Sequence, residues 1–162
     1  MTQQQPRILV LGLGNDILGD DAVGLIAARR LRAHCPAQVD IVEAAESGLG
    51  LLDFLEGRRH ALLLDAILTG RHPAGTVLEF SQADFHGTIG PSPHYAGLPE
   101  VLRLADCLAI PVPADLCVLA MEVEDPYLIR EGLSQPVDEA LSSYVLRARQ
   151  ILDGWQRALR IA

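Results

Sequence analysis

Short apolar runs alternate along this sequence with longer stretches in which apolar residues recur every three or four positions. The run at 7–12 (RILVLG) is apolar after its first residue and ends in glycine, which is typical of a strand covered on both faces. The stretch at 20–35 has the apolar spacing of a helix, with arginines near its end, where cations complement the helix dipole. Strands and helices that alternate in this way form mostly parallel sheets through right-handed crossovers.

The same criteria locate the other elements. We predict strands at 7–12, 38–44, 60–68, 75–81 and 115–122, and helices at 20–35, 48–57, 94–109 and 134–161. The 162 residues suit one domain. We therefore expect a single α/β domain over residues 1–162, with a doubly wound, mostly parallel five-stranded sheet and helices on both faces. Residues 81–93 lack a periodic apolar pattern and predict a long loop, a kind of segment that often carries function.

Charge and apolar content exclude several kinds of partner. Lys and Arg number 13 against 21 Asp and Glu, a formal charge of −8, which disfavours nucleic acid and anionic membranes. No apolar run approaches the roughly 20 residues of a membrane-spanning helix. The first residues, MTQQQPR, do not resemble a secretory signal, so we expect a cytoplasmic protein. Cys35, Cys107 and Cys117 are too far apart for a Cys-x-x-Cys site and predict reduced, packed cysteines.

Residues 12–21 (GLGNDILGDD) lie between the first predicted strand and the first helix. Glycines there are also found in dinucleotide-binding loops, but such a loop needs a third small residue where this chain has Ile17. Asp20 and Asp21 place negative charge where a pyrophosphate would meet the helix N-terminus. Glu43, at the end of the second strand, has the position of an acid that binds ribose, so nucleotide binding stays open as an alternative.

Each acidic residue at this end of the sheet also has a structural explanation. Asp20 fits the N-cap of the first helix. Asp21 either complements the helix dipole or serves as a ligand, and the local sequence does not decide between these roles. Asp65 follows a buried apolar run, where a charge costs free energy unless it is hydrogen-bonded, as by capping the next turn, or bound to a cation.

Three candidate ligands follow from the predicted topology. The loops after the first and third strands are neighbours in the common strand order 2-1-3, so Asp21 and Asp65 can converge at the carboxyl ends of the strands. His94 lies where the long loop meets the next helix and can reach the same point. Two carboxylates and an imidazole suit Ni²⁺, Zn²⁺, Mn²⁺ or Fe²⁺, and three protein ligands leave coordination positions open.

Three segments carry a family resemblance: GLGNDILGDD at 12–21, LDA at 64–66 and SPH at 92–94. Their order and spacing resemble those of the hydrogenase maturation endopeptidases, which trim the C-terminal extension from the large subunit of nickel–iron hydrogenases. The resemblance spans nearly the whole chain. Tyr95 stands where the family often has Gln, and Ala22 where Gly is common, and both departures bear on substrate contacts more than on the class.

The resemblance implies an endopeptidase that acts on a hydrogenase large-subunit precursor after nickel insertion. Asp21, Asp65 and His94 would be the catalytic and nickel-contacting residues, and the Ni²⁺ would belong to the precursor, with Cd²⁺ or Zn²⁺ as substitutes in crystals. We expect a monomer whose choice of client depends on residues 81–93. Besides nucleotide binding, there is a second alternative to the peptidase: a nickel-sensing chaperone that holds the precursor without cleaving it.

Overall fold

The structure, a computed structural model, describes residues 8–36, 38–86 and 97–161. Five strands form one sheet in the order β2-β1-β3-β5-β4. Four of them are parallel, and β4 pairs with β5 in the antiparallel direction at one edge. The predicted fold class is therefore confirmed. The strands are β1 (Ile8–Leu13), β2 (Val39–Ala44), β3 (His60–Ile67), β4 (Val77–Ser81) and β5 (Asp115–Glu122).

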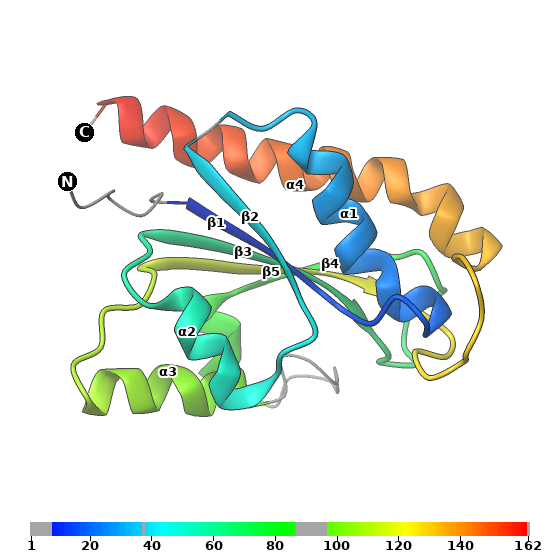
Figure 1. The fold of residues 1–162 in the computed structure, drawn as a ribbon, viewed down its shortest axis with the longest axis horizontal. Helices are drawn as coiled ribbons and strands as arrows, with labels where there is room; N and C mark the ends of the chain where they lie inside the picture. The colour runs from blue at the N-terminus through cyan, green and yellow to red at the C-terminus, as the bar shows by residue number, and fades with distance from the viewer. Residues whose placement is uncertain (1–7, 37, 87–96, 162) are drawn as a thin grey trace.

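Helices cover both faces of the sheet: α1 and α4 lie on one face, and α2 and α3 lie on the other (Figure 1). Two short 3₁₀ turns lead into helices, η1 (Gly19–Ala22) into α1 and η2 (Gly48–Gly50) into α2, and a third, η3 (Gln82–His86), follows β4. The α-helices are α1 (Val23–Arg32), α2 (Leu51–Leu55), α3 (Leu98–Cys107) and α4 (Gln135–Ile161). No helix in this described part of the chain has the length and apolar content to cross a bilayer.

Most element boundaries agree closely with the sequence prediction. The predicted strand at 115–122 coincides with β5. The first predicted helix, 20–35, is shorter in the structure, because its start is the 3₁₀ turn η1 and α1 ends at Arg32. The helix predicted at 94–109 begins at Leu98, with Pro99 in its first turn, where a missing N–H costs nothing. Of the predicted loop at 81–93, residues 82–86 form η3, and 87–93 lie outside the described residues.

Alternating side chains of the strands bury both faces of the sheet. In β1, Ile8 and Val10 belong to a cluster with α1 and α4, whereas Leu9, Leu11 and Leu13 pack with residues of α2 and α3. All six residues of β1 are buried, which explains why this strand is an apolar run without polar alternation.

Two glycines bring α1 into direct contact with the sheet. A Cβ on Gly12 of β1 would lie 2.6 Å from the carbonyl oxygen of Gly24. A Cβ on Gly24, in the first turn of α1, would overlap the carbonyl oxygens of Leu13 and Leu64. Only glycine fits at a backbone contact this close. The start of α1 is thereby fixed against the carboxyl ends of β1 and β3.

At the same end of the sheet, Asp20 joins η1 to the start of α4. The carboxylate of Asp20 accepts hydrogen bonds from the backbone N–H of Ser134 at 2.6 Å and from its hydroxyl at 2.7 Å. The predicted N-cap role of Asp20 is wrong: Leu18 occupies the N-cap of η1, and neither η1 nor α1 has a side-chain cap. The carboxylate instead binds a residue 114 positions later, which no local pattern reveals.

We expect Gly24→Ala to lower the free energy of unfolding by at least about 2 kcal/mol, because the new methyl group would force α1 away from the sheet. Urea unfolding monitored by circular dichroism measures the loss. Gly154→Ala is the matched control, since Gly154 lies in α4 with nothing within 4 Å of an added Cβ, and it should stabilise the protein by about 0.8 kcal/mol. Equal effects of the two substitutions would contradict the close contact at Gly24.

We expect Asp20→Ala to lower the free energy of unfolding by about 2–3 kcal/mol, because it removes a charged acceptor from two donors. Ser134→Ala removes only the hydroxyl donor and should cost less. The double variant should lose about 1 kcal/mol less than the sum of the single losses, because both single variants remove the same bond. Ser143→Ala, which breaks only a local bond to Ala140, is the control. Strict additivity in urea unfolding would show that the two residues do not interact.

Candidate active site

Asp21 lies inside the turn η1, and it is only 2% exposed. Two hydrogen-bonded turns lead to it: the N–H of Leu18 donates to the carbonyl of Asn15, and the N–H of Asp21 donates to the carbonyl of Leu18. Gly14 has a φ of +144°, and a Cβ there would overlap the carbonyl oxygen of Asp21. Residues 14–18, between β1 and η1, form a loop that we call the glycine loop. It folds back onto η1, and this contact fixes the backbone that carries the Asp21 carboxylate.

Asp65 lies in β3, opposite Ala120 of β5, and is fully buried. Its Oδ1 accepts the backbone N–H of Ala66 at 2.8 Å. The acceptor role expected of Asp65 is thus present, but the donor lies within the same strand and not in a following turn. A buried carboxylate near the end of a strand is costly unless donors or a cation compensate its charge, so Asp65 is a candidate for chemistry.

Tyr144 of α4 fixes the backbone at Asp65. Its hydroxyl donates to the carbonyl of Leu119 at 2.6 Å and accepts the N–H of Asp65 at 3.0 Å. Asp65 is two residues from both Leu63 and Ile67, which pack on the α2 and α3 side, so its side chain leaves the sheet on that same face. Tyr144 contacts the backbone of the same residue from the opposite face, and this contact holds in place the part of β3 that carries the carboxylate.

The structure brings Asp21 and Asp65 to the same edge of the sheet. β1 and β3 are parallel neighbours, with Gly12 opposite Leu64. Gly24, three residues after Asp21, lies directly against the carbonyl of Leu64, one residue before Asp65. The two carboxylates thus come from adjacent backbone segments, as the strand order predicted.

The third predicted ligand, His94, lies outside the described residues, so its position relative to the two carboxylates stays a prediction. Within residues 8–36, 38–86 and 97–161, no group of three or more His, Cys, Asp or Glu side chains has an arrangement that could hold a metal ion. The two carboxylates on their own are oxygen donors, which suit hard and borderline divalent cations better than thiolate-preferring ones. A metal ion at this place would take its further ligands from elsewhere in the chain or from the substrate.

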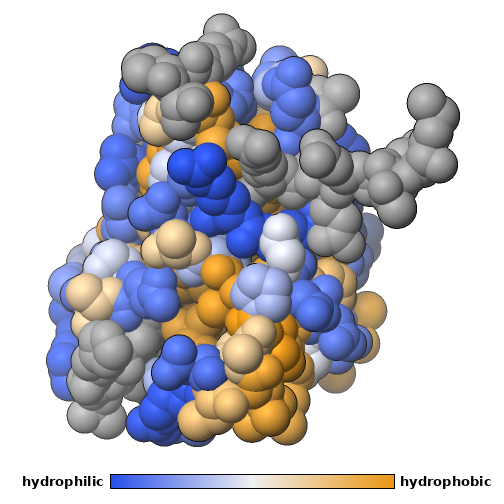
Figure 2. Space-filling view, turned by 90° about the vertical axis from the view of Figure 1, so that its left-hand side faces the viewer, coloured by the Kyte–Doolittle hydropathy of each residue, from blue (hydrophilic) through white to orange (hydrophobic). Residues whose placement is uncertain are grey.

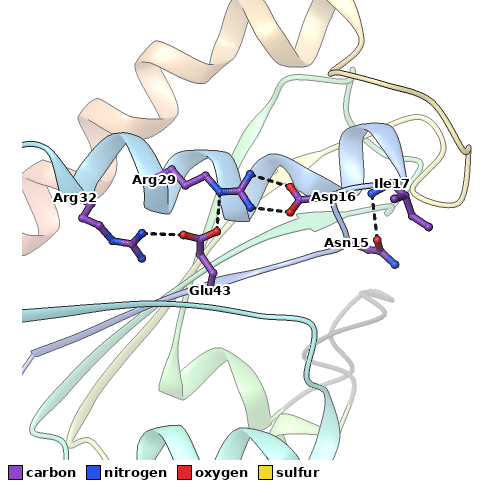
Figure 3. A network of polar contacts seen from close by, with 6 residues as sticks. All are labelled: Asn15, Asp16, Ile17, Arg29, Arg32 and Glu43. Atoms are coloured by element: carbon purple, nitrogen blue, oxygen red, sulfur yellow. Dashed lines mark hydrogen bonds and ion pairs between the residues drawn. The ribbon is translucent and has the colours of Figure 1, made fainter.

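A polar network holds the glycine loop against α1 and β2 (Figure 3). The guanidinium of Arg29 binds both carboxylate oxygens of Asp16, at 2.8 and 2.7 Å, and its Nε donates to Glu43 at 2.6 Å. Arg32 also pairs with Glu43, at 3.0 Å. Hydrogen bonds from Arg29 hold the pKa of Asp16 below its usual value. The network closes the outer side of the loop that leads to Asp21.

These contacts weigh against nucleotide binding. Glu43, which the sequence offered as a ribose-binding acid, is engaged by two arginines and only 22% exposed. Asp20 and Asp21 are both buried at the start of α1, where a pyrophosphate would need free backbone N–H groups and a positive potential. The site chemistry is that of carboxylates and not of phosphate recognition.

Cysteine chemistry is also disfavoured. The three cysteines are free thiols, as predicted. Cys117 is buried in β5, and burial raises the pKa of its thiol to about 12, whereas a cysteine nucleophile needs a lowered pKa. Cys107 ends α3 and is exposed. Neither residue belongs to the loops that carry Asp21 and Asp65.

Two hollows lie at the other edge of the sheet, toward the amino ends of the parallel strands. One, of about 380 Å³, is lined by residues of α3 and of the segment before β5, among them Leu102, Ile110 and Val112. Figure 2 views this edge and shows apolar side chains gathered in its lower half, at the level of α2 and α3. A second, of about 520 Å³, lies between β4, β5 and α4. Both are remote from the two carboxylates.

Sequence reasoning missed two residues that position the site. Tyr144 lies within the helix predicted at 134–161, and the hydroxyl of a buried tyrosine requires hydrogen-bond partners, which is the signal that could have identified it. Ser134 is the first residue of that predicted helix. The sequence gives no sign that its partner is Asp20, because the two residues meet only through the tertiary fold.

Comparisons with known proteins identify the family of this chain. A family model described as hydrogenase maturation protease matches residues 25–151. The hydrogenase 2 maturation protease of Escherichia coli K12 is 37% identical over 102 residues, which are 59% of this chain and 61% of that protein. The hydrogenase expression/formation protein HupD of Bradyrhizobium diazoefficiens is 30% identical over 158 residues, covering 95% of this chain and 82% of that protein.

Solved structures give the same result. The hydrogenase maturating endopeptidase HybD from E. coli superimposes with a TM-score of 0.75 at 28% identity, over 94% of this chain and 93% of that one. The [NiFe] hydrogenase maturation protease HybD from Thermococcus kodakarensis has a TM-score of 0.71 at 25% identity, over 90% and 98%. The family model matches most of the chain, including Asp65, and the fold agrees with that of these two solved structures. The chain therefore belongs to the hydrogenase maturation protease family.

Proposed function

We propose that this protein is an endopeptidase that removes the C-terminal extension of a nickel–iron hydrogenase large-subunit precursor after nickel has been inserted. The observation that carries the proposal is the pair of buried carboxylates, Asp21 and Asp65, on adjacent backbone segments at the carboxyl edge of the sheet. Active sites of open α/β sheets lie beyond this edge. The partner is the precursor, a choice supported by the maturation function that the names of the relatives print.

In this proposal the nickel is part of the substrate. Asp21, Asp65 and His94 contact the Ni²⁺ of the precursor and thereby fix the scissile bond next to them. Carboxylate and imidazole ligands suit this ion, with Cd²⁺ or Zn²⁺ as substitutes in crystals. Recognition of inserted nickel would restrict cleavage to precursors that have completed their metal centre.

Hydrolysis requires that a water molecule lose a proton as its oxygen attacks the carbonyl carbon of the scissile bond, and that the leaving nitrogen gain one. The precursor's nickel can lower the pKa of a water bound to it, and a carboxylate can accept the proton directly. Both routes place the reacting water beside Asp21 and Asp65. A cytoplasmic location and a monomeric state stay predictions from the sequence.

We expect Asp21→Asn, Asp65→Asn and His94→Ala each to slow processing of nickel-loaded precursor at least about a hundredfold, because each removes a group that binds nickel or moves a proton. Mass spectrometry of the precursor measures loss of the extension, and thermal melting checks the fold. Asp53→Asn and His72→Ala, at exposed positions, are the matched controls and should process at the wild-type rate.

Other results of these processing experiments would contradict separate parts of the proposed function. Full activity in the three variants would remove these residues from the site. Equal cleavage of nickel-free precursor would remove nickel recognition. A precursor that binds the wild-type protein but is never shortened would favour the chaperone alternative over the peptidase.

A further inference from the structure

Four exposed apolar side chains lie on two neighbouring segments close in the chain or in space to η1, which carries Asp21, and we name these four the apolar rim. They are Ile17, Tyr127, Leu128 and Ile129, with 63%, 66%, 50% and 76% of their surface exposed. The first belongs to the loop between β1 and η1, and the other three to the segment between β5 and α4. Figure 1 shows both segments on the side of the molecule where β1 and β5 end. Large apolar side chains gathered on a surface mark binding sites.

The two segments of the apolar rim are held together by direct contacts. Leu18 and Arg130 form an isolated parallel bridge. A Cβ on Gly19 would lie 2.5 Å from Cγ of Arg130 and 3.3 Å from the carbonyl oxygen of Leu128. Ser134, beyond the second segment, is bound by Asp20. Because the backbone is already fixed, a partner that covers the rim pays little ordering entropy.

The outward direction of these side chains follows from what occupies the inner side of each segment. In the first segment, Asn15 accepts the N–H of Ile17 at 3.1 Å and Asp16 binds Arg29, and the Ile17 side chain points away from this network (Figure 3). In the second, Asp125 accepts the N–H of Tyr127 at 2.8 Å. The polar groups close the turns, and the apolar groups are left facing water.

The place of the rim beside the candidate site indicates its occupant. Ile17 precedes Asp21 by four residues, and Leu128 lies against Gly19. A peptidase that acts on a folded protein must contact surface beyond the scissile bond. Resting on the function proposed above, we propose that the apolar rim docks the folded body of the large-subunit precursor while its extension lies at Asp21 and Asp65.

The charged residues around the apolar rim indicate the charge expected on the docking surface of the precursor. The same segment carries three exposed acids, Glu124, Asp125 and Glu131, against one exposed cation, Arg130, whose guanidinium donates to the carbonyl of Leu133. The precursor should therefore present an apolar area bordered by Lys or Arg side chains. A second copy of this chain is a poor occupant, because a symmetric contact would oppose like acidic borders on a protein of formal charge −8.

We expect Ile129→Ser and Tyr127→Ser each to raise KM for nickel-loaded precursor about tenfold with kcat unchanged, because an exposed anchor that becomes buried on binding contributes to docking and not to the chemical step. Precursors of the nickel–iron hydrogenases of the same organism are the substrates. Ile129→Leu keeps the apolar surface and should retain the wild-type KM. Leu146→Ser, at an apolar position of α4 that is 55% exposed, is the matched control.

The outcomes separate this inference from the proposed function. If the wild-type protein cleaves the precursor and both serine variants keep its KM, the docking surface is wrong and the peptidase stands. If the wild-type protein cleaves none of the precursors, both proposals fail. If Ile129→Ser instead dissolves a dimer seen by size-exclusion chromatography and leaves KM unchanged, the rim is a contact between copies of this chain, which also overturns the inference.

Discussion

The close contact between α1 and the carboxyl ends of β1 and β3 is the constraint on which the rest of the site depends. Gly24 lies against the carbonyls of Leu13 and Leu64, and Gly12 lies against the carbonyl of Gly24. Without these backbone contacts a side chain would separate helix from sheet, and Asp21 would move away from Asp65. The site is therefore built by the absence of side chains at two positions as much as by the carboxylates themselves.

The carboxylates at this edge have different roles although they lie close in sequence or in space. Asp20 is matched by two donors of Ser134 and ties α4 to η1. Asp65 is fixed by a backbone contact to Tyr144, which also belongs to α4. The long last helix thus supports both parts of the site from one face of the sheet. Burying several acids at one edge costs free energy, and the donors of Ser134 and of the Ala66 backbone offset part of that cost.

The fold and part of the site could be predicted from local patterns. Burial on both faces gives β1 its unbroken apolar run, and the limits of β5 were predicted to the residue. Prediction failed where a polar side chain binds a distant partner. Asp20 has the sequence context of an N-cap, yet it binds Ser134 because tertiary packing brings the start of α4 against η1. Glu43 looked available to a ligand, and Arg29 and Arg32 of the neighbouring helix occupy it.

The sequence alone determined the alternation of strands and helices, the parallel sheet and the carboxyl edge at which Asp21 and Asp65 lie, because apolar periodicity and strand order are properties of short segments. Only the tertiary structure decided the partner of each polar group: Ser134 for Asp20, Tyr144 for the backbone of Asp65, and Arg130 beside Gly19. These partners are far apart in the chain. Their contacts arise from how α1, β5 and α4 pack together, and that packing is not encoded in any one segment.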